Sequence, residues 1–201
     1  MNHQQVFNST FRALLKEAQF TRELLGSGAT QIGKAHYAAK GVCFQTFTGL
    51  STGVERIGKL CLMLDHYVDH RGTFLDSTYM SRKINHNIDA ILEKSQQMIS
   101  KYPVSMKFLS NLNGPIHQAI QSILCAFALG DRYSNINLLV GDSRQNDPIA
   151  AWFQRVDRPL FETHIPKKKK EVILRNAKIV GLLYATHTRV RYISEVEKEM
   201  R

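Results

Sequence analysis

Arg82 and His86 are two residues whose types and spacing suit chemistry. They lie four positions apart, so on an α-helix both side chains would lie on one face. A histidine titrates near neutral pH and can accept the proton of a ribose 2′-hydroxyl, while an arginine can neutralise the charge that develops on the phosphate. The pair therefore suits RNA cleavage without a metal ion. The alternative is that His86 caps or packs against a neighbouring helix.

A second group of residues has the spacing of a metal site. His66 and His70 also lie four positions apart, beside Asp65 and Asp69, and two imidazoles with this spacing can hold one metal ion on a helix. No cysteine or third patterned ligand lies nearby in the sequence, and the Glu-x-x-His motifs of di-metal helical bundles are absent. We therefore expect solvated surface histidines, with no metal and no cofactor.

The densest run of positive charge is Lys167, Lys168, Lys169 and Lys170. The chain carries 27 Lys and Arg against 17 Asp and Glu, a net charge of +10, which favours RNA or DNA as a partner ahead of a membrane surface. Lysines at the start of a helix oppose the helix dipole, which favours an external anion at this place. The alternative is a well-hydrated loop, and a basic composition also serves solubility.

The elements that must position these residues are predicted to be helices. A first helix extends from Val6 to Leu25 and ends at Gly26–Gly28. A second extends from about residue 44 to His70, and a third begins near Ser77 and continues to Met98. Apolar residues at alternating spacings of three and four predict one buried stripe on the second helix; they are Phe47, Leu50, Val54, Ile57, Cys61, Leu64 and Val68.

The second half of the chain also predicts helices. Pro115 opens an apolar helix that ends at Gly130, and Asp147 with Pro148 has the chemistry of another helix start. Pro166 precedes a long last helix. Strand signals are weak throughout, so the sequence predicts an all-α bundle, and 201 residues with 43% hydrophobic content suit a single domain over 1–201.

The cysteines and the N-terminus predict a cytoplasmic protein. The chain has three cysteines and no CxxC pair, so they are expected to be small hydrophobic residues in a reducing compartment. The N-terminus lacks the pattern of a secretory signal, and no stretch approaches the roughly 18 uncharged apolar residues that span a membrane. We therefore expect no membrane association.

Two segments carry a family resemblance: GLSTGVERIGKL at residues 49–60 and SRKINHNIDAIL at residues 81–92. They resemble the paired signatures of HEPN-like helical domains, a family tied to RNA cleavage, nucleotide binding and prokaryotic defence. Gly53, Glu55 and Lys59 match a Gly-x-Glu-x-x-x-Lys pattern of this family, and Arg132 with Tyr133 matches a later Arg-Tyr element. We interpret Glu55 and Lys59 as architectural, because a helical pair of this kind contributes only about 0.2–0.5 kcal/mol.

The resemblance also identifies a second candidate for the catalytic pair. Ribonuclease members of the family usually carry an arginine, four to six intervening residues and a histidine. Arg158 and His164 have five intervening residues, but the composition alone should produce about 1.6 such matches. Pro159 and Pro166 leave this segment barely two helical turns. Arg82 and His86 are therefore the first choice, and Arg158 with His164 the second.

The resemblance covers residues 44–139 and implies an RNA-acting protein with an all-α HEPN-like bundle. It further implies a cytoplasmic homodimer, acting as a metal-independent ribonuclease in a toxin–antitoxin or antiphage system, with a cognate antitoxin or defence protein as a partner. Arg132 and the four lysines are the expected nucleic-acid contacts. The competing hypothesis is a catalytically silent helical adaptor that binds a partner protein, a nucleotide or nucleic acid.

Overall fold

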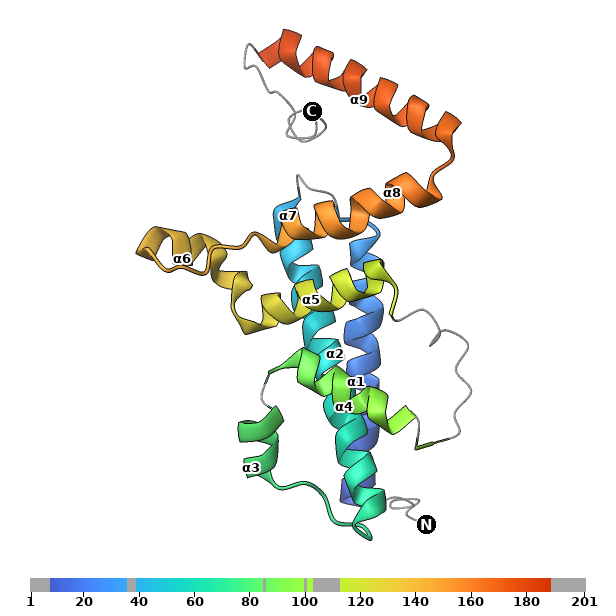
Figure 1. The fold of residues 1–201 in the computed structure, drawn as a ribbon, viewed down its shortest axis with the longest axis vertical. Helices are drawn as coiled ribbons and strands as arrows, with labels where there is room; N and C mark the ends of the chain where they lie inside the picture. Colours follow the sequence, from blue (N-terminus) through green and yellow to red (C-terminus); the bar gives the residue numbers. More distant parts are fainter. Residues whose placement is uncertain (1–7, 36–38, 85, 100, 103–112, 189–201) are drawn as a thin grey trace, which may run out of the picture. The chain divides into compact units, whose positions relative to one another are not determined.

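The computed structural model describes residues 8–35, 39–84, 86–99, 101–102 and 113–188 (Figure 1). Every regular element within these ranges is helical, so the all-α prediction is confirmed for them. The chain divides into two compact units, Met1–Asp157 and Arg158–Arg201. The expectation of one domain stays a prediction. None of the described helices is long and apolar enough to cross a membrane.

Helices α1 (Ser9–Ile32) and α2 (Lys40–Asp69) are the longest elements of the first unit and pack against each other (Figure 1). Asn8 caps α1 by accepting a hydrogen bond from the backbone N–H of Phe11. The predicted end of α1 at Gly26–Gly28 was wrong. At Gly28 a Cβ atom would lie 2.7 Å from Leu50 of α2, so this glycine allows close helix packing instead of ending the helix. This contact outweighs the weak helix propensity of glycine.

The buried stripe predicted on α2 is correct only in its first part. Phe47 is fully buried and Leu50 and Val54 are half-buried, but Ile57 and Leu64 are 37% and 39% exposed. Cys61 and Val68 are also exposed. A stripe with heptad spacing drifts by about 20° per heptad around a straight helix, so a face that is buried at Phe47 has turned away from its neighbours near Val68. The side chains and glycines that α2 buries instead include Thr46, Ser51, Gly53, Gly58 and Leu60.

The helix predicted from Ser77 to Met98 is interrupted. The structure has a short α3 (Ser77–Tyr79), a π-helix η1 (Met80–Ile84) and a separate α4 (Ile88–Ile99). Asn87 begins α4, because its side-chain oxygen accepts a hydrogen bond from the N–H of Ala90. An asparagine in this role favours a new helix start over a continuous helix.

The core of the first unit forms where α2 meets α5 (Pro115–Leu129). The start of α5 at Pro115 and its end before Gly130 are as predicted. The rings of Phe47 and Phe127 meet edge to face with centroids 5.7 Å apart, and the ring centroid of Trp152 lies 5.2 Å from that of Phe47. Such aromatic pairs contribute beyond the burial of apolar area.

The rest of the first unit is formed by short helices. They are η3 (Asp131–Tyr133), α6 (Ser134–Val140), α7 (Pro148–Trp152) and the π-helix η4 (Phe153–Asp157). Gly141 ends α6 with φ 74°, a conformation that glycine adopts readily. The predicted helix start at Asp147 is confirmed, since its carboxylate accepts hydrogen bonds from the N–H groups of Ile149 and Ala150.

The second unit contains α8 (Arg158–His164) and α9 (Lys167–Thr188). The long last helix is therefore present from Lys167 onwards, and its predicted continuation beyond Thr188 lies outside the described residues. Lys170 ties the two helices together, because its ammonium donates to the carbonyl oxygen of Glu162.

Candidate functional site

A cluster of three side chains forms where α2 faces the segment that precedes α4. The carboxylate of Glu55 accepts a hydrogen bond from Lys59 at 2.6 Å and lies 3.0 and 3.1 Å from Nδ1 of His86. Glu55 and Lys59 have side chains only 15% and 22% exposed, whereas the imidazole of His86 is 66% exposed. A largely buried carboxylate thus holds an imidazole that faces solvent.

The cluster depends on the close approach of α2 and α4. At Gly58 a Cβ atom would lie 2.1 Å from Cγ2 of Ile91, so no larger residue fits there without displacing α4. Ile91 and Ile88 are fully buried. Asn87 starts α4 immediately after His86, which fixes the backbone beside the histidine. Glycine on α2 and the cap of α4 therefore place Glu55 and His86 within hydrogen-bonding distance.

The electrostatics of the cluster determine which nitrogen of His86 is available for chemistry. Burial raises the pKa of Glu55, but the hydrogen bonds and charges of Lys59 and His86 outweigh it, and the net pKa is lowered. Glu55 is therefore ionised near neutral pH, and an ionised carboxylate can only accept hydrogen bonds. Nδ1 of His86 must be the donor, which leaves the lone pair on Nε2 when the ring is neutral.

The first-choice pair does not share the continuous helix on which the prediction depended. Arg82 is exposed in η1, which ends at Ile84, and His86 lies in the turn that precedes α4. A spacing of four therefore no longer places both side chains on one helical face. Among the described residues, His86 makes its polar contacts with Glu55. Whether Arg82 acts with His86 stays a prediction.

The second-choice pair lies within α8 of the second unit. Arg158 donates a hydrogen bond to Glu162 at 3.0 Å, and Nδ1 of His164 lies 2.6 Å from the hydroxyl of Thr163. The helix is seven residues long, in agreement with the two turns that the prolines allow. Both side chains are exposed, but the arginine is engaged by a neighbouring carboxylate.

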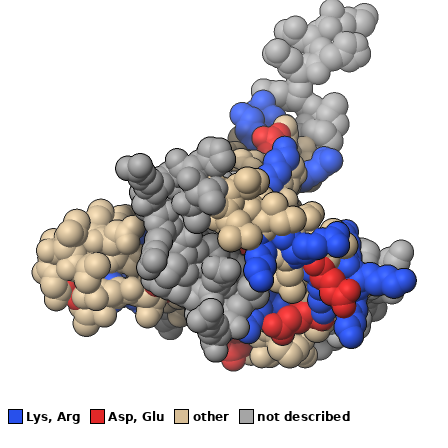
Figure 2. All heavy atoms as spheres, turned by 90° about the horizontal axis from the view of Figure 1, so that it is seen from above, with Lys and Arg blue, Asp and Glu red and all other residues tan. Residues whose placement is uncertain are grey.

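The predicted nucleic-acid contacts are solvent-facing with one exception. Lys167, Lys168 and Lys169 are exposed in the first turn of α9, whereas Lys170 is half-buried and bonded to α8. Arg132 lies in η3 with its guanidinium 5.1 Å from the ring centroid of Tyr133. Lys and Arg gather over parts of the described surface, while the α6 end at the left of Figure 2 carries few charges.

His66 and His70, which have the spacing of two metal ligands on a helix, stack on each other. The rings of His66 and His70 have centroids 3.6 Å apart, and Lys101 holds the neighbouring carboxylates of Asp65 and Asp69 at 2.8 and 2.5 Å. Within the part of the chain that the structure describes, no three His, Cys, Asp or Glu side chains group as metal ligands. The acidic residues beside the histidines therefore serve an ion-pair network.

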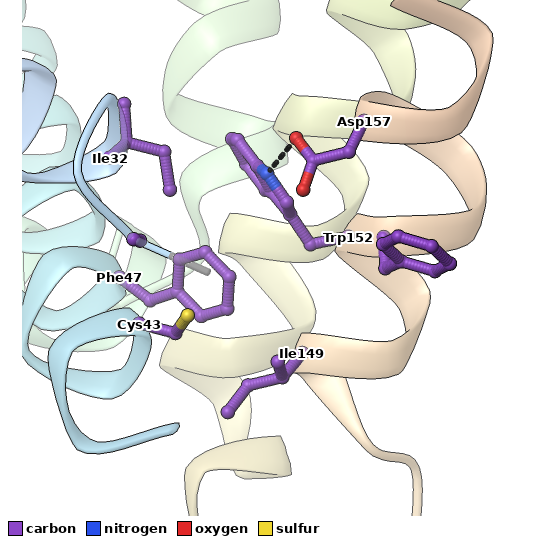
Figure 3. Close-up of a pocket in the computed structure, with 8 residues that line it drawn as sticks. Ile32, Cys43, Phe47, Ile149, Trp152 and Asp157 are labelled. Atoms are coloured by element: carbon purple, nitrogen blue, oxygen red, sulfur yellow. Dashed lines mark hydrogen bonds between the residues drawn. The ribbon is translucent and has the colours of Figure 1, made fainter. Parts of the chain in front are cut away.

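A small cavity lies between the end of α1, the start of α2 and α7–η4 (Figure 3). Trp152 donates a hydrogen bond to Asp157 at 3.0 Å, and Cys43 and Phe47 lie across the cavity from α7. Partial desolvation raises the pKa of Asp157, and burial together with the Asp157 charge raises the pKa of Cys43. The space suits about one water molecule, and the raised pKa makes Cys43 a poor nucleophile.

Glu55 has a larger role in the cluster than its spacing along α2 predicts. Its spacing to Lys59 is that of an ordinary helical pair, which gave it an architectural interpretation. The available signal was the Gly-x-Glu-x-x-x-Lys pattern itself, on the helix next to a histidine-containing segment. Spacing along one helix cannot show that a residue 31 positions away, His86, completes the cluster.

Comparison with known proteins supplies no relative. No protein-family model, no curated protein and no solved structure matches the chain.

Proposed function

We propose that the chain is a HEPN-like RNA-acting protein in which His86 serves as the general base of a metal-independent ribonuclease. The observation that carries this proposal is the contact between Glu55 and His86. A carboxylate that accepts from Nδ1 orients the imidazole and stabilises the imidazolium that forms when Nε2 takes up a proton. The exposed imidazole can be reached by a large substrate such as RNA.

Apart from water, the chemistry requires no group beyond the side chains in and near the cluster. Nε2 of His86 takes the proton of a ribose 2′-hydroxyl, and the 2′-oxygen then forms a bond to phosphorus while the bond from phosphorus to the 5′-oxygen breaks. A water molecule protonates the leaving 5′-oxygen, and the hydroxide that remains takes the proton back from His86, so the product carries a 2′,3′-cyclic phosphate and the imidazole is neutral again. Arg82, exposed on the neighbouring η1, is the candidate for neutralising the phosphate charge.

The charge distribution supports RNA as the substrate. The net charge is +10, and three lysines at the start of α9 face solvent without a carboxylate partner among the described residues. Such lysines release counterions when phosphates bind, which is a main source of nucleic-acid affinity. Arg132 in η3 is a further candidate contact.

The resemblance to HEPN-like domains adds the cellular setting of the proposal. It implies a cytoplasmic homodimer that works with an antitoxin or another defence protein. Light scattering of the purified protein at tens of micromolar tests the dimer, and a monomer at that concentration would contradict this part.

Cleavage of total RNA in the presence of EDTA tests the proposed reaction. We expect His86→Ala to lower the rate by about 10²–10⁴, the usual contribution of a positioned general base. Glu55→Gln and Arg82→Ala should reduce cleavage strongly while RNA binding and helicity stay unchanged. His164→Ala is the matched control, because His164 is also an exposed histidine, and it should have a mild effect.

The outcomes of this experiment separate the two candidate pairs. Loss of cleavage in His164→Ala with normal activity in His86→Ala would favour Arg158 and His164 and contradict the role of Glu55. Cyclic phosphate ends on the products support attack by the 2′-oxygen, whereas activity that EDTA abolishes would contradict the metal-independent mechanism.

Salt dependence of RNA binding tests the α9 lysines separately from catalysis. Lys168→Gln with Lys169→Gln should lower the slope of log K against log salt by about 1.4, since each contact to single-stranded nucleic acid contributes about 0.7. The control is Lys16→Gln with Lys34→Gln, which removes the same charge from the first unit. Equal slopes for both double variants would remove the α9 lysines from the RNA site.

A second candidate function is a catalytically silent adaptor. Leu138, Leu139 and Val140 of α6 are 60%, 85% and 73% exposed in a region with few charges (Figure 2), and adjacent exposed apolar side chains favour a protein partner. Among the described residues, no arginine makes a hydrogen bond or ion pair with Glu55 or His86. RNA that remains intact with the wild-type protein would favour the adaptor.

A further inference from the structure

A groove of about 870 Å³, counting its open mouth, lies between α5 and the α7–η4 segment of the first unit. Its walls carry small apolar side chains, including Ala126 of α5 and Ala150 and Ala151 of α7. None of the residues proposed for RNA cleavage lines it. A concave surface with apolar walls and a few polar groups is the usual form of a small-molecule site.

One end of the groove holds a buried carboxylate with unused hydrogen-bonding capacity. Asp131 is 4% exposed, and its Oδ1 accepts no hydrogen bond from the described residues. Nε of Arg144 lies 3.3 Å from this oxygen and supplies a compensating charge, but it does not donate a hydrogen bond to it. Nη1 of Arg144 donates a hydrogen bond to the carbonyl oxygen of Leu129. A buried carboxylate oxygen without a donor is costly, and because Asp131 lines the groove, a cationic ligand group beside it would stabilise the carboxylate.

The other end of the groove carries the positive charge of Arg155. Both terminal nitrogens of Arg155 lie 3.4 Å from the hydroxyl of Ser122, a long contact to a neutral group. Arg155 forms no ion pair with a described carboxylate. The seven residues from Ser122 to the end of α5 at Leu129 cover about 10 Å at 1.5 Å per residue, so the two charges lie at separate ends.

We propose that this groove binds an elongated dipolar small molecule, with an ammonium or guanidinium group at Asp131 and a carboxylate or phosphate group at Arg155. The apolar middle of the groove accommodates the chain that joins the two ends. A polyanion is disfavoured, because Asp147 also lines the groove and adds negative charge near the start of α7.

A series of ω-amino carboxylic acids measures the required separation of charge directly. Full-length protein is titrated with aminobutanoate, aminohexanoate, aminooctanoate and aminododecanoate by calorimetry. Trp152, the single tryptophan of the chain, provides a fluorescence signal next to the groove wall at Ala151. We expect the tightest binding at an intermediate length, with octanoate and octylamine weaker than aminooctanoate, because each offers only one charged end.

Variants at the two ends assign the binding to this groove. Arg155 is exposed, so Arg155→Gln should lower the affinity for aminooctanoate about threefold to fivefold, as expected for one exposed charge pair. The affinity for octylamine should stay unchanged. Asp131→Asn should lower the affinity for octylamine as well as for aminooctanoate. Because this change alters a buried ion pair, the helicity of the variant protein is checked first. Arg22→Gln, at another exposed arginine, is the matched control.

Three results would overturn the proposal. They are equal affinities for the one-ended and two-ended compounds, an Arg155→Gln variant that binds like the wild type, and no binding of any member of the series at millimolar concentration. Phosphoethanolamine and longer amino-phosphates in the same titration distinguish a phosphate-bearing ligand from a carboxylate-bearing one.

Discussion

The close packing of α2 against α4 at Gly58 allows us to predict the stability of the variant Gly58→Ala. The added methyl group would lie 2.1 Å from Cγ2 of Ile91, far inside van der Waals contact. Ile91 is fully buried and β-branched, so its χ1 angle cannot adjust freely. Overpacking of this kind costs about 1–3 kcal/mol, while replacing glycine by alanine in a helix contributes about 1 kcal/mol in the opposite direction.

We therefore expect Gly58→Ala to lower the free energy of unfolding by up to about 2 kcal/mol in urea denaturation followed by Trp152 fluorescence. Gly26→Ala is the matched control, because Gly26 is also helical and a Cβ added there would meet no atom within 4 Å. This control should raise the free energy of unfolding by about 1 kcal/mol.

The double variant Gly58→Ala with Ile91→Ala tests the physical cause. The new methyl group then occupies space that Cγ2 has vacated, so the combined cost should be smaller than the sum of the two single costs by about 1 kcal/mol. If Gly58→Ala were as stable as Gly26→Ala, the close approach of α2 and α4 would be refuted, together with its role in holding Glu55 against His86.

Three further variants or treatments test separate features of the first unit. Asp147→Ala removes the cap of α7 and should cost about 1 kcal/mol in thermal unfolding. Lys101→Met removes the hydrogen bond that lowers the pKa of Asp65; the stability difference from wild type should be present at neutral pH and disappear as the pH falls through the lowered pKa, below about 3.9. Iodoacetamide at pH 8 should label Cys61 before Cys125. Burial raises the pKa of both thiols, but Cys61 is exposed, whereas Cys125 is buried and has its pKa raised to about 11.

The local signals in the sequence were sufficient for the helical class and for several helix boundaries. Pro115 and the Asp147–Pro148 pair mark helix starts through effects that act within one turn of the chain, a fixed φ and a side-chain cap. Gly130 ends α5 for an equally local reason, its positive φ of 153°. These predictions were correct because no distant contact was needed to decide them.

Tertiary contacts decided the features that the sequence left open. Gly28 continues α1 because Leu50 of α2 packs against it, although glycine by itself favours a helix end. The outer half of the predicted α2 stripe, from Ile57 onwards, is exposed because burial depends on where α1 and α4 lie, and not on periodicity alone. For the same reason the spacing of His86 suggested a partner four residues away, whereas the packing of α2 against α4 provides Glu55, 31 residues away, as the group that holds it.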